Sequence, residues 1–458
     1  MNSVHERLEI RDPIHGFIYR EPEERDIIDT KVFQRLRRLK QLAMASLVYP
    51  GATHSRFEHC LGAFHLSGKL VAGLSSNDTD QRLVRFAALL HDIGHGPFSH
   101  VAEPILKKHT PTGQIDAAVK DSKIHELISW QIIRKNAELA ELISDKQREQ
   151  IIGLLNGTWG NSYLQEIVSG PVDVDKQDYL LRDSLFSGVK YGVYDQERLS
   201  NTLLVHEDGD DSFLAVSIDG IHALEQFVLA KYYMTTQVYR HRIRLITDQM
   251  IARAIDLGIE EDKIPWLKDL YSYDGSDEYI REYLTWFDDR VVSEILDKRA
   301  PDGYAKDLFV RLQNRQLFKC IFEVSPNDFP DPSVRNFVFG CDSEFYKPLE
   351  NLIATKFEFD RNHVIAYMIK FDSAARTESE IPVVHRTKTT LFHDESALFN
   401  SVDQKIREQK FHIYAPAKYH DDKDKKRKIR EYKNEILNLI AELANPQRAL
   451  KLDGGQTQ

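Results

Sequence analysis

The sequence predicts a mainly α-helical protein, with a large helical bundle followed by a smaller C-terminal lobe that mixes helices and strands. Apolar residues recur at helical spacing through most of the first 300 residues. Runs rich in β-branched and aromatic residues become frequent only beyond that point. The length of 458 residues exceeds what one hydrophobic core normally organises. We therefore expect two domains, a catalytic domain at 1–300 and an α+β lobe at 301–458.

The N-terminal part begins with a short hairpin and continues as helices. Residues 10–19 have two apolar arms around Asp12-Pro13 and Gly16, which predicts the hairpin. A helix is expected to follow, with Asp29 or Thr30 as its N-cap and apolar positions recurring as far as residue 43. Further helices are expected over residues 56–74, 81–91, 124–136, 175–186 and 220–257.

Strand-like runs mark the second half of the chain. Residues 212–218 follow a turn-forming stretch and predict one arm of an isolated hairpin. The basic run 423–428 continues into an amphipathic helix, so its charges are expected to be a solvated first turn. Strands of the C-terminal lobe are expected at residues 317–324, 334–339, 364–371, 381–391 and 411–414.

Composition limits the compartment and the partners. Hydrophobic residues at 42% and charged residues at 29% are typical of a protein with a packed core. The formal net charge of −10 is unfavourable for tracking long nucleic acids, so small anionic substrates are the expected partners. Cys60, Cys320 and Cys341 are too scattered for a disulfide framework and are expected to be reduced core thiols. Because no signal-like or membrane-length apolar run is present, we expect a cytoplasmic protein that does not enter membranes.

The segment 87–100 has the highest density of chemically active side chains. An apolar helix ends there in His91 and Asp92, and His95 and His100 follow across a turn broken by glycine and proline. A single histidine in an apolar setting is more often a core residue than a ligand. Three histidines and a carboxylate within ten residues instead favour a site, because a helix end lets neighbouring side chains converge and glycines leave room for it.

Two other segments offer partners for that cluster. His59 lies on the expected helix 56–74, and Asp175 begins a helix that carries Tyr179 and Asp183 on the same face. Asp173 or Asp175 could instead serve only as the N-cap of that helix. A shell of imidazoles and carboxylates suits iron, manganese, zinc or nickel better than calcium, and magnesium is a further candidate. Such an ion can lower the pKa of bound water from about 15.7 to around 7 and neutralise charge on a phosphoryl oxygen.

At this point the residues resemble a known family. His59, the adjacent His91 and Asp92, and Asp175 are similar to the H…HD…D signature of the HD-domain phosphohydrolases. Within that family, the chain looks like a bacterial homologue of the sterile-alpha-motif-and-HD-domain deoxynucleoside triphosphate triphosphohydrolases. The core motifs fall within residues 52–183. The matching segments are 12–16, 33–37, 40–42, 49–59, 91–100 and 173–179.

The resemblance implies a reaction and the residues that carry it. It implies cleavage of deoxynucleoside triphosphates at the α-phosphorus, giving deoxynucleoside and triphosphate, with His59, His91, Asp92 and Asp175 as ligands of a divalent metal. His95, His100 and His125 would surround the scissile phosphate, and one of them would be the general acid, unranked by sequence. The implied substrate contacts are Arg56, Lys176, Tyr179 and Lys231 for phosphates, and Gln41, Leu42, Asp183 and Tyr239 for deoxyribose.

The family resemblance also implies assembly and regulation. A homo-oligomer, commonly a tetramer in this branch, is implied, together with a nucleotide activator read by Asp29, Gln34 and Arg37. The chain departs from the family's arginine and histidine at Lys231 and Thr235. Lysine keeps the charge there but loses the bidentate fork of arginine.

Two other functions remain open at the level of sequence. The same metal site could act on another nucleotide or phosphate ester, because HD sites host several such reactions. Alternatively, the chain could be a nucleic-acid or nucleotide sensor with a structural metal, although its negative net charge argues against this.

Overall fold

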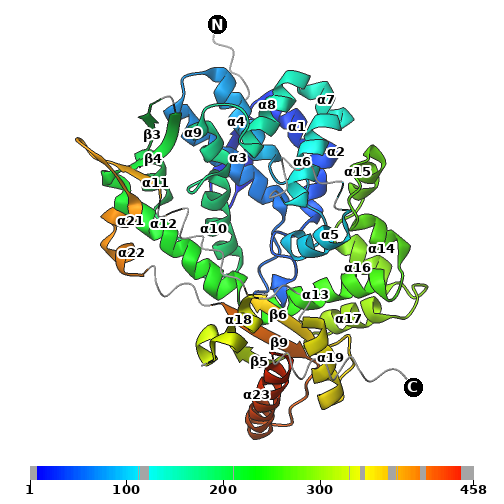
Figure 1. Cartoon of the computed structure of the whole chain (residues 1–458). Helices are drawn as coiled ribbons and strands as arrows, with labels where there is room; N and C mark the ends of the chain where they lie inside the picture. Colours follow the sequence, from blue (N-terminus) through cyan, green and yellow to red (C-terminus); the bar gives the residue numbers. More distant parts are fainter. Residues whose placement is uncertain are drawn as a thin grey trace. The chain divides into compact units, whose positions relative to one another are not determined.

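The chain folds into two compact units. A computed structural model describes residues 8–111, 113, 123–209, 211–329, 331–340, 346–369, 378, 380–402 and 409–444. The first unit comprises Met1–Leu245, Lys263–Pro301 and Ala375–Ser401, and the second comprises Ile246–Asp262, Asp302–Ala374 and Val402–Gln458. Helices dominate the described residues, and strands are few (Figure 1). The predicted class, mainly α with a smaller sheet-containing C-terminal region, is confirmed.

The first unit is a bundle of helices whose apolar faces pack together. Helix α3 (Arg56–Leu74) has the predicted bounds and buries most of its residues. It packs against α4 (Asp78–Leu90), which leads into His91 and Asp92, and against α10 (Val174–Phe186), which carries Asp175 (Figure 1). The other helices of this unit are α1 (Pro22–Ile28), α2 (Lys31–Gln34), α5 (Glu103–His109), α6 (Ile124–Lys135), α7 (Ala137–Leu142), α8 (Asp145–Asn156), α9 (Ser162–Ser169), α11 (Gln196–Thr202), α12 (Ile221–Tyr233), α14 (Pro265–Leu270), α15 (Asp277–Tyr283), α16 (Asp288–Leu296) and α21 (Phe392–Glu395), while α13 (Arg242–Glu260) and α22 (Ala397–Val402) run on into the second unit.

Two small sheets belong to the first unit. The predicted N-terminal hairpin is present as β1 (Leu8–Asp12) and β2 (Gly16–Arg20), paired antiparallel. The expected arm at 212–218 is β4 (Asp211–Ser217), but it is not part of an isolated hairpin. It lies in a four-stranded sheet of order β3-β4-β7-β8, completed by β3 (Leu203–Asp208), β7 (Pro382–Val384) and β8 (Thr389–Leu391). This sheet therefore joins strands from both sides of the expected boundary at residue 300.

Two of the expected helices are interrupted. Thr30 is the N-cap, as predicted, but α2 ends at Gln34 and passes into a 3-10 turn over Arg35–Arg38. The expected helix at 220–257 is broken into α12, a π-helical turn over Met234–Tyr239, and α13. The π turn changes the direction in which its side chains point, and Tyr239 is thereby brought to a partner in α10.

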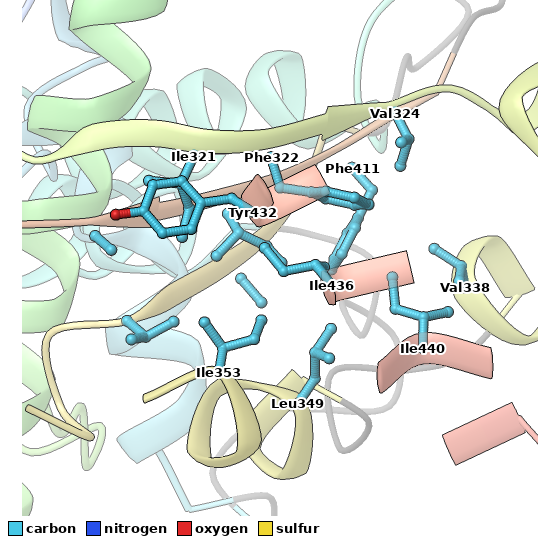
Figure 2. Close-up of a cluster of buried hydrophobic side chains, with 14 of the residues drawn as sticks. Ile321, Phe322, Val324, Val338, Leu349, Ile353, Phe411, Tyr432, Ile436 and Ile440 are labelled. Atoms are coloured by element: carbon cyan, nitrogen blue, oxygen red, sulfur yellow. The ribbon is translucent and has the colours of Figure 1, made fainter. Parts of the chain in front are cut away.

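The second unit is built around a three-stranded antiparallel sheet of order β5-β9-β6. Three of the predicted strands correspond to β5 (Lys319–Val324), β6 (Ile365–Ile369) and β9 (Lys410–Ala415). The strand expected at 381–391 is instead divided between β7 and β8 of the first unit, because a turn interrupts it. Helices α17 (Tyr304–Gln313), α18 (Pro332–Gly340), α19 (Tyr346–Phe357) and α23 (Asp422–Ala444) complete this unit. Figure 2 shows its apolar side chains gathered between the strands and these helices, including Phe322, Phe411 and Ile436.

One expected strand of this unit is a helix. Residues 334–339 lie within α18, which packs against α23. Val334 and Val338 are four residues apart, so both reach the core of the unit on one helical face. The β-branched and aromatic composition predicted a strand, and packing against α23 overrides that preference.

We expect Ile436→Ala to destabilise the second unit by about 2 to 5 kcal/mol, because the side chain is fully buried and its removal leaves a cavity. Urea unfolding followed by hydrogen exchange at β9 would measure the loss. Asn438→Ala is the control, since this residue is exposed on the same helix. Equal stabilities of the two variants would contradict the prediction.

The predicted core thiols are consistent with the structure. Cys60 and Cys320 are buried thiols that form no disulfide within the described residues. Cys341 lies outside the described residues. Among the described helices, none combines the length and the apolar character needed to span a bilayer.

Candidate metal centre and catalytic pocket

A capping box fixes the first turn of helix α3, and this turn carries His59. The Glu58 carboxylate accepts a hydrogen bond from the Ser55 backbone N–H at 2.9 Å, which closes a capping box. His59 follows within the first turn and is fully buried. The local sequence therefore fixes both the start of the helix and the position of this imidazole.

The glycine turn after α4 brings His91 and Asp92 towards α3. His91 is the C-cap of α4. The turn runs so close to α6 that a Cβ at Gly94 would lie 2.3 Å from the His125 carbonyl oxygen and 2.3 Å from the Ser129 nitrogen. Ser129 fixes the approach, because its hydroxyl donates to the His91 carbonyl at 3.0 Å and accepts from the Gly94 N–H at 2.9 Å. Glycine is needed here for close backbone contact.

At the start of helix α10, one aspartate caps the helix and a different aspartate is the candidate metal ligand. The Asp173 carboxylate accepts from the Lys176 backbone N–H at 2.7 Å and is the N-cap. Asp175 is free of that task, and its Oδ1 lies 3.0 Å from His59 Nε2.

Three of the four expected ligands, His59, His91 and Asp175, form one group, and Asp92 lies beside it, paired with Arg56. His59 Nε2 lies 3.3 Å from His91 Nε2 and 3.7 Å from an Asp92 oxygen. His91 Nε2 lies 3.4 Å from Asp92 Oδ1 and 3.7 Å from Asp175 Oδ1. Two ligand atoms that each stand about 2.1 Å from one ion, at 90° or tetrahedrally, are roughly 3.0 to 3.4 Å apart. The closest of these separations match that geometry, and His59, His91 and Asp175 form a group that could hold a divalent metal.

The ionised carboxylates around the candidate metal ligands favour a positive charge at this position. Burial by itself lowers the pKa of His59, but the hydrogen bonds that its imidazole donates to Asp175 and Asp178 outweigh burial and raise the pKa to about 10. Burial opposes ionisation of Asp92, yet the Arg56 guanidinium and the neighbouring histidines hold its pKa well below the usual range. A cation here is therefore stabilised by carboxylates that stay ionised.

Asp178 orients His59 through the ring nitrogen that faces away from the other candidate ligands. No motif in the sequence had pointed to Asp178. Its Oδ2 lies 2.9 Å from His59 Nδ1, so Nε2 is left to face the other ligands. His91 is oriented in the same way, through Nδ1 at 2.8 Å from the Ala88 carbonyl. Asp178 is fully buried and also receives the Arg182 guanidinium at 2.8 and 2.9 Å.

We expect Asp178→Asn to weaken metal affinity by about 10- to 100-fold, because carboxylate support of a ligating histidine is worth that much. Competition with a metal-sensitive dye would measure the change. Asp145→Asn, on the exposed start of α8, is the matched control. A metal affinity within twofold of the unmodified protein would show that Asp178 has no orienting role.

Three histidines form a second cluster beside the ligands. The rings of His95 and His125 stack with centroids 3.8 Å apart, and His100 meets His95 edge-on at 4.7 Å. Burial, with the nearby charges of Arg56 and His125, lowers the pKa of His95 well below its ordinary value. His125 Nδ1 instead lies 2.9 Å from a carboxylate oxygen of Glu103, a partner that the sequence analysis missed.

A cavity of about 240 Å³ opens onto both clusters. Arg56 is almost fully buried in its wall, where its Nε donates to Ser99 Oγ at 2.9 Å and its guanidinium pairs with Asp92. Lys176 reaches the cavity from α10, and the carboxylates of Asp173 and Asp175 outweigh burial and raise its pKa. Of the expected site residues, the lining includes Gln41, Arg56, His91, Asp92, His100, His125, Asp175, Lys176 and Tyr179.

The residues expected at the sugar form a connected group. Tyr239 donates its hydroxyl proton to Asp183 at 2.7 Å, and Asp183 also bonds His54 Nε2 at 2.7 Å. Leu42 is buried, and Tyr239 packs against its cluster. The Tyr239 and Tyr179 rings lie 6.1 Å apart, edge to face. Tyr179 links this group to the cavity.

Lys231 and the expected activator residues have partners of their own. The Lys231 ammonium pairs with Glu378, a buried carboxylate that the sequence analysis did not single out. Arg37 Nε donates to Gln34 Oε1 at 2.8 Å, and its guanidinium covers the Phe57 ring at 3.5 Å. Asp29 is exposed and is the C-cap of α1.

The unanticipated partners share one property. Asp178, Glu103 and Glu378 each contact a site residue. The spacing of residues along a helix does not predict these contacts. The only sequence signal for Asp178 was its place three residues after Asp175, on the helix already assigned to the site.

Comparison with known proteins gives consistent similarities. Residues 56–183 match the model of the HD domain, and residues 194–442 match that of the HD associated region. An uncharacterised protein of Methanocaldococcus jannaschii is 30% identical over 447 residues, covering 95% of this chain and 84% of the relative. The deoxynucleoside triphosphate triphosphohydrolase SAMHD1 of Homo sapiens is 31% identical, over 69% of this chain and 55% of its own length. The crystal structure of a phosphohydrolase from Bacteroides thetaiotaomicron superposes with a TM-score of 0.70 at 26% identity, covering 90% of this chain and all of that one.

Proposed function

The chain belongs to the HD-domain family that includes the SAMHD1 deoxynucleoside triphosphate triphosphohydrolases and their bacterial homologues, and we propose that it hydrolyses deoxynucleoside triphosphates to deoxynucleoside and triphosphate. The chain is an HD-superfamily phosphohydrolase. The substrate and the position of cleavage are our proposal. We assign the reaction to residues 1–300, with the core motifs at 52–183.

One observation carries the proposal. Three of the candidate metal ligands, two cationic side chains and two histidines of the second cluster line the same cavity: His91, Asp92, Asp175, Arg56, Lys176, His100 and His125. A triphosphate brings several negative charges into a site that already contains carboxylates, so it needs cations close to the metal. Arg56 and Lys176, which also pair with Asp92 and Asp173, supply these charges inside the cavity, and Tyr179 adds a hydroxyl donor. When bound, the divalent metal would supply an activated water and neutralise charge at the attacked phosphate.

The proposed general acid is His125. The 5'-oxygen of the nucleoside leaves readily only if it receives a proton. Burial lowers the pKa of His95 and favours its neutral form, whereas the Glu103 carboxylate lies 2.9 Å from His125 Nδ1 and leaves Nε2 available to donate. His95 and His100 would hold the phosphate oxygens beside it.

We expect Glu103→Gln to lower kcat by about 10²-fold or more, because general acid catalysis contributes roughly 10² to 10⁴. The amide oxygen can still accept a hydrogen bond from His125 Nδ1 but carries no negative charge. KM should change little, since Glu103 acts through His125. Steady-state kinetics with Glu141→Gln, at an exposed position of the neighbouring helix α7, as the control would measure this. A matched rise in KM with unchanged kcat would assign Glu103 to binding instead.

The proposed preference for deoxyribose is steric. Leu42 and Tyr239 pack together, and Asp183 holds the Tyr239 hydroxyl, so this wall cannot easily move aside for a 2'-hydroxyl. Gln41 lines the neighbouring part of the cavity and would contact the 3'-hydroxyl.

Product analysis tests the reaction. The protein, loaded in turn with iron, manganese, magnesium, zinc and nickel, is incubated with each of the four dNTPs and with ATP. We expect triphosphate and deoxynucleoside as products and little turnover of ATP, with Leu42→Ala relaxing the preference. Release of inorganic phosphate or pyrophosphate alone would refute the assigned cleavage.

A second candidate substrate is another nucleotide or phosphate ester with a shorter phosphate chain. The Lys231–Glu378 pair favours it, because the lysine expected at the triphosphate end is already neutralised by a carboxylate. Faster turnover of nucleoside monophosphates than of dNTPs in the same assay would select this alternative.

We also propose, from the family resemblance, a cytoplasmic homo-oligomer that responds to a nucleotide activator through Asp29, Gln34 and Arg37. Light scattering coupled to size-exclusion chromatography, with and without GTP, tests the assembly. Sensitivity of turnover to GTP that is lost in Arg37→Ala would support the activator site, and a GTP response unchanged in that variant would refute it.

A further inference from the structure

A buried carboxylate joins two segments that border the catalytic pocket. Asp288 is the first residue of α16 and is 3% exposed. Its Oδ1 accepts the backbone N–H of Phe98 at 2.8 Å, and its Oδ2 accepts the backbone N–H of Lys40 at 2.9 Å. The two segments are far apart in the sequence, and each of them occupies one oxygen of the same carboxylate.

The first segment is the histidine turn, residues 94–100, and its backbone needs support. Phe98 lies between His95 and His100. The φ angles of Phe98 and Ser99, 61° and 53°, fall in the left-handed region that residues with a Cβ rarely adopt. Such a backbone persists only where its surroundings hold it. The hydrogen bond from the Phe98 N–H to Asp288 provides this support directly.

The second segment is the sugar segment, residues 40–42. It contains Gln41 and Leu42, the residues proposed to contact the deoxyribose. A further bond joins it to the histidine turn, because the Ser99 hydroxyl donates to the Lys40 carbonyl at 3.1 Å. The N–H and the carbonyl of Lys40 are therefore both fixed relative to the histidine turn, one through Asp288 and one through Ser99.

Other contacts hold the histidine turn without reaching the sugar segment. The Tyr283 hydroxyl donates to the Gly94 carbonyl at 2.9 Å, and the Arg35 guanidinium donates to the His95 carbonyl at 2.9 Å. Asp288 differs from both side chains, because its second oxygen binds residue 40. The effects of Asp288 and Tyr283 on the pocket can therefore be compared.

We propose that Asp288 is a positioning residue, which fixes the sugar segment relative to the histidines at the scissile phosphate. This role rests on the proposed hydrolysis of deoxynucleoside triphosphates. The substrate has to contact both segments at once, since its deoxyribose and its α-phosphate are joined through one oxygen. A misplacement of about 1 Å in such a site can cost roughly 10²-fold in rate. Rate and sugar preference should therefore change together when Asp288 is altered.

Asp288→Asn tests this role in the full-length, metal-loaded protein. The amide has nearly the same size, but it replaces one acceptor oxygen by a donor, so one of the two N–H groups loses its partner. We expect kcat/KM for dATP to fall by about tenfold or more. The ratio of kcat/KM for dATP to that for ATP should fall several-fold. Asp289→Asn is the matched control, because it removes the same charge from the next, exposed residue of α16 and should leave both quantities unchanged.

Two comparisons separate positioning from a purely structural role. A lower Tm for Asp288→Asn with an unchanged dATP-to-ATP ratio would overturn the proposal. Tyr283→Phe removes a support of the histidine turn alone, and we expect it to lower kcat without changing this ratio. An equal loss of sugar preference in Tyr283→Phe would also overturn the proposal, because a loosened turn would then be a sufficient explanation.

Ser99→Ala provides the test if Asp288→Asn does not fold. It removes the other bond between the two segments without removing a charge. The dATP-to-ATP ratio should fall in the same direction, and an unchanged ratio in Ser99→Ala would contradict the proposed link between the segments.

Amide hydrogen exchange gives a measurement that needs no turnover. In Asp288→Asn, exchange at the Lys40 or the Phe98 amide should become about tenfold faster or more, and Asp289→Asn should leave both rates unchanged. Unchanged exchange at both amides in Asp288→Asn would overturn the proposal. Failure of the proposed reaction is a different result, because the unmodified protein would then release no triphosphate from dATP.

Discussion

Asp175→Ala is expected to abolish both metal retention and turnover while leaving the fold intact. Asp175 Oδ1 lies 3.0 Å from His59 Nε2, and its side chain is partly exposed, so its removal opens the metal centre without cutting into a core. Without the ion, water regains a pKa near 15.7, and we expect activity to fall by roughly 10³-fold or more. Metal content by mass spectrometry and kcat for dNTP hydrolysis are the two measurements.

Asp145→Ala is the control for this variant, because it also removes one carboxylate near the start of a helix but lies far along the chain, with its side chain 95% exposed. Far-UV circular dichroism and the Tm in chelator should match the unmodified protein for both variants. Retention of one metal equivalent by Asp175→Ala with full activity would contradict the assignment of this carboxylate as a ligand.

Arg182→Met is expected to be the most destabilising single change in the first unit, at about 3 to 5 kcal/mol. Arg182 is fully buried and donates to Asp178 at 2.8 and 2.9 Å and to Asp12 at 2.9 Å. Methionine fills a similar space but leaves two buried carboxylates without their cation. The cost of these unpaired charges exceeds any gain from the apolar side chain.

Guanidinium unfolding monitored by fluorescence would measure the loss. Arg134→Met is the matched control, because the Arg134–Glu149 pair is half exposed and such pairs contribute only about 0 to 1 kcal/mol. The N-terminal hairpin should loosen in Arg182→Met, since Asp12 also accepts the backbone N–H groups of Ile14 and His15. A smaller loss in the free energy of unfolding for Arg182→Met than for Arg134→Met would show that the ion pairs of Arg182 contribute little to stability.

Several elements could be predicted because their information is local. The start of α3 follows from Ser55 and Glu58, and the N-terminal hairpin follows from Gly16 between two apolar arms. Helix α23 follows from the spacing of Tyr432, Ile436 and Ile440. In each case, the residues that define the element lie within a few turns of one another along the chain.

Other elements could not be predicted because distant contacts decide them. Residues 334–339 have the composition of a strand but form part of α18, since α23 supplies a helical partner. The π turn at Met234–Tyr239 ends at a tyrosine that bonds Asp183, more than 50 residues earlier in the chain. Pairing of β7 with β4 joins segments that a boundary at residue 300 separates.

The sequence by itself determined the helical class and the chemical identity of the candidate metal ligands, because His59, His91, Asp92 and Asp175 lie in recognisable local motifs. Only the tertiary structure decided how those ligands are oriented and charged. Asp178 directs the His59 imidazole, Glu103 supports His125, and the hairpin residue His15 reaches Asp178 from 163 positions away. Hydrogen bonds and buried charges act over a few ångströms in space, and their partners are brought together only when the helices pack.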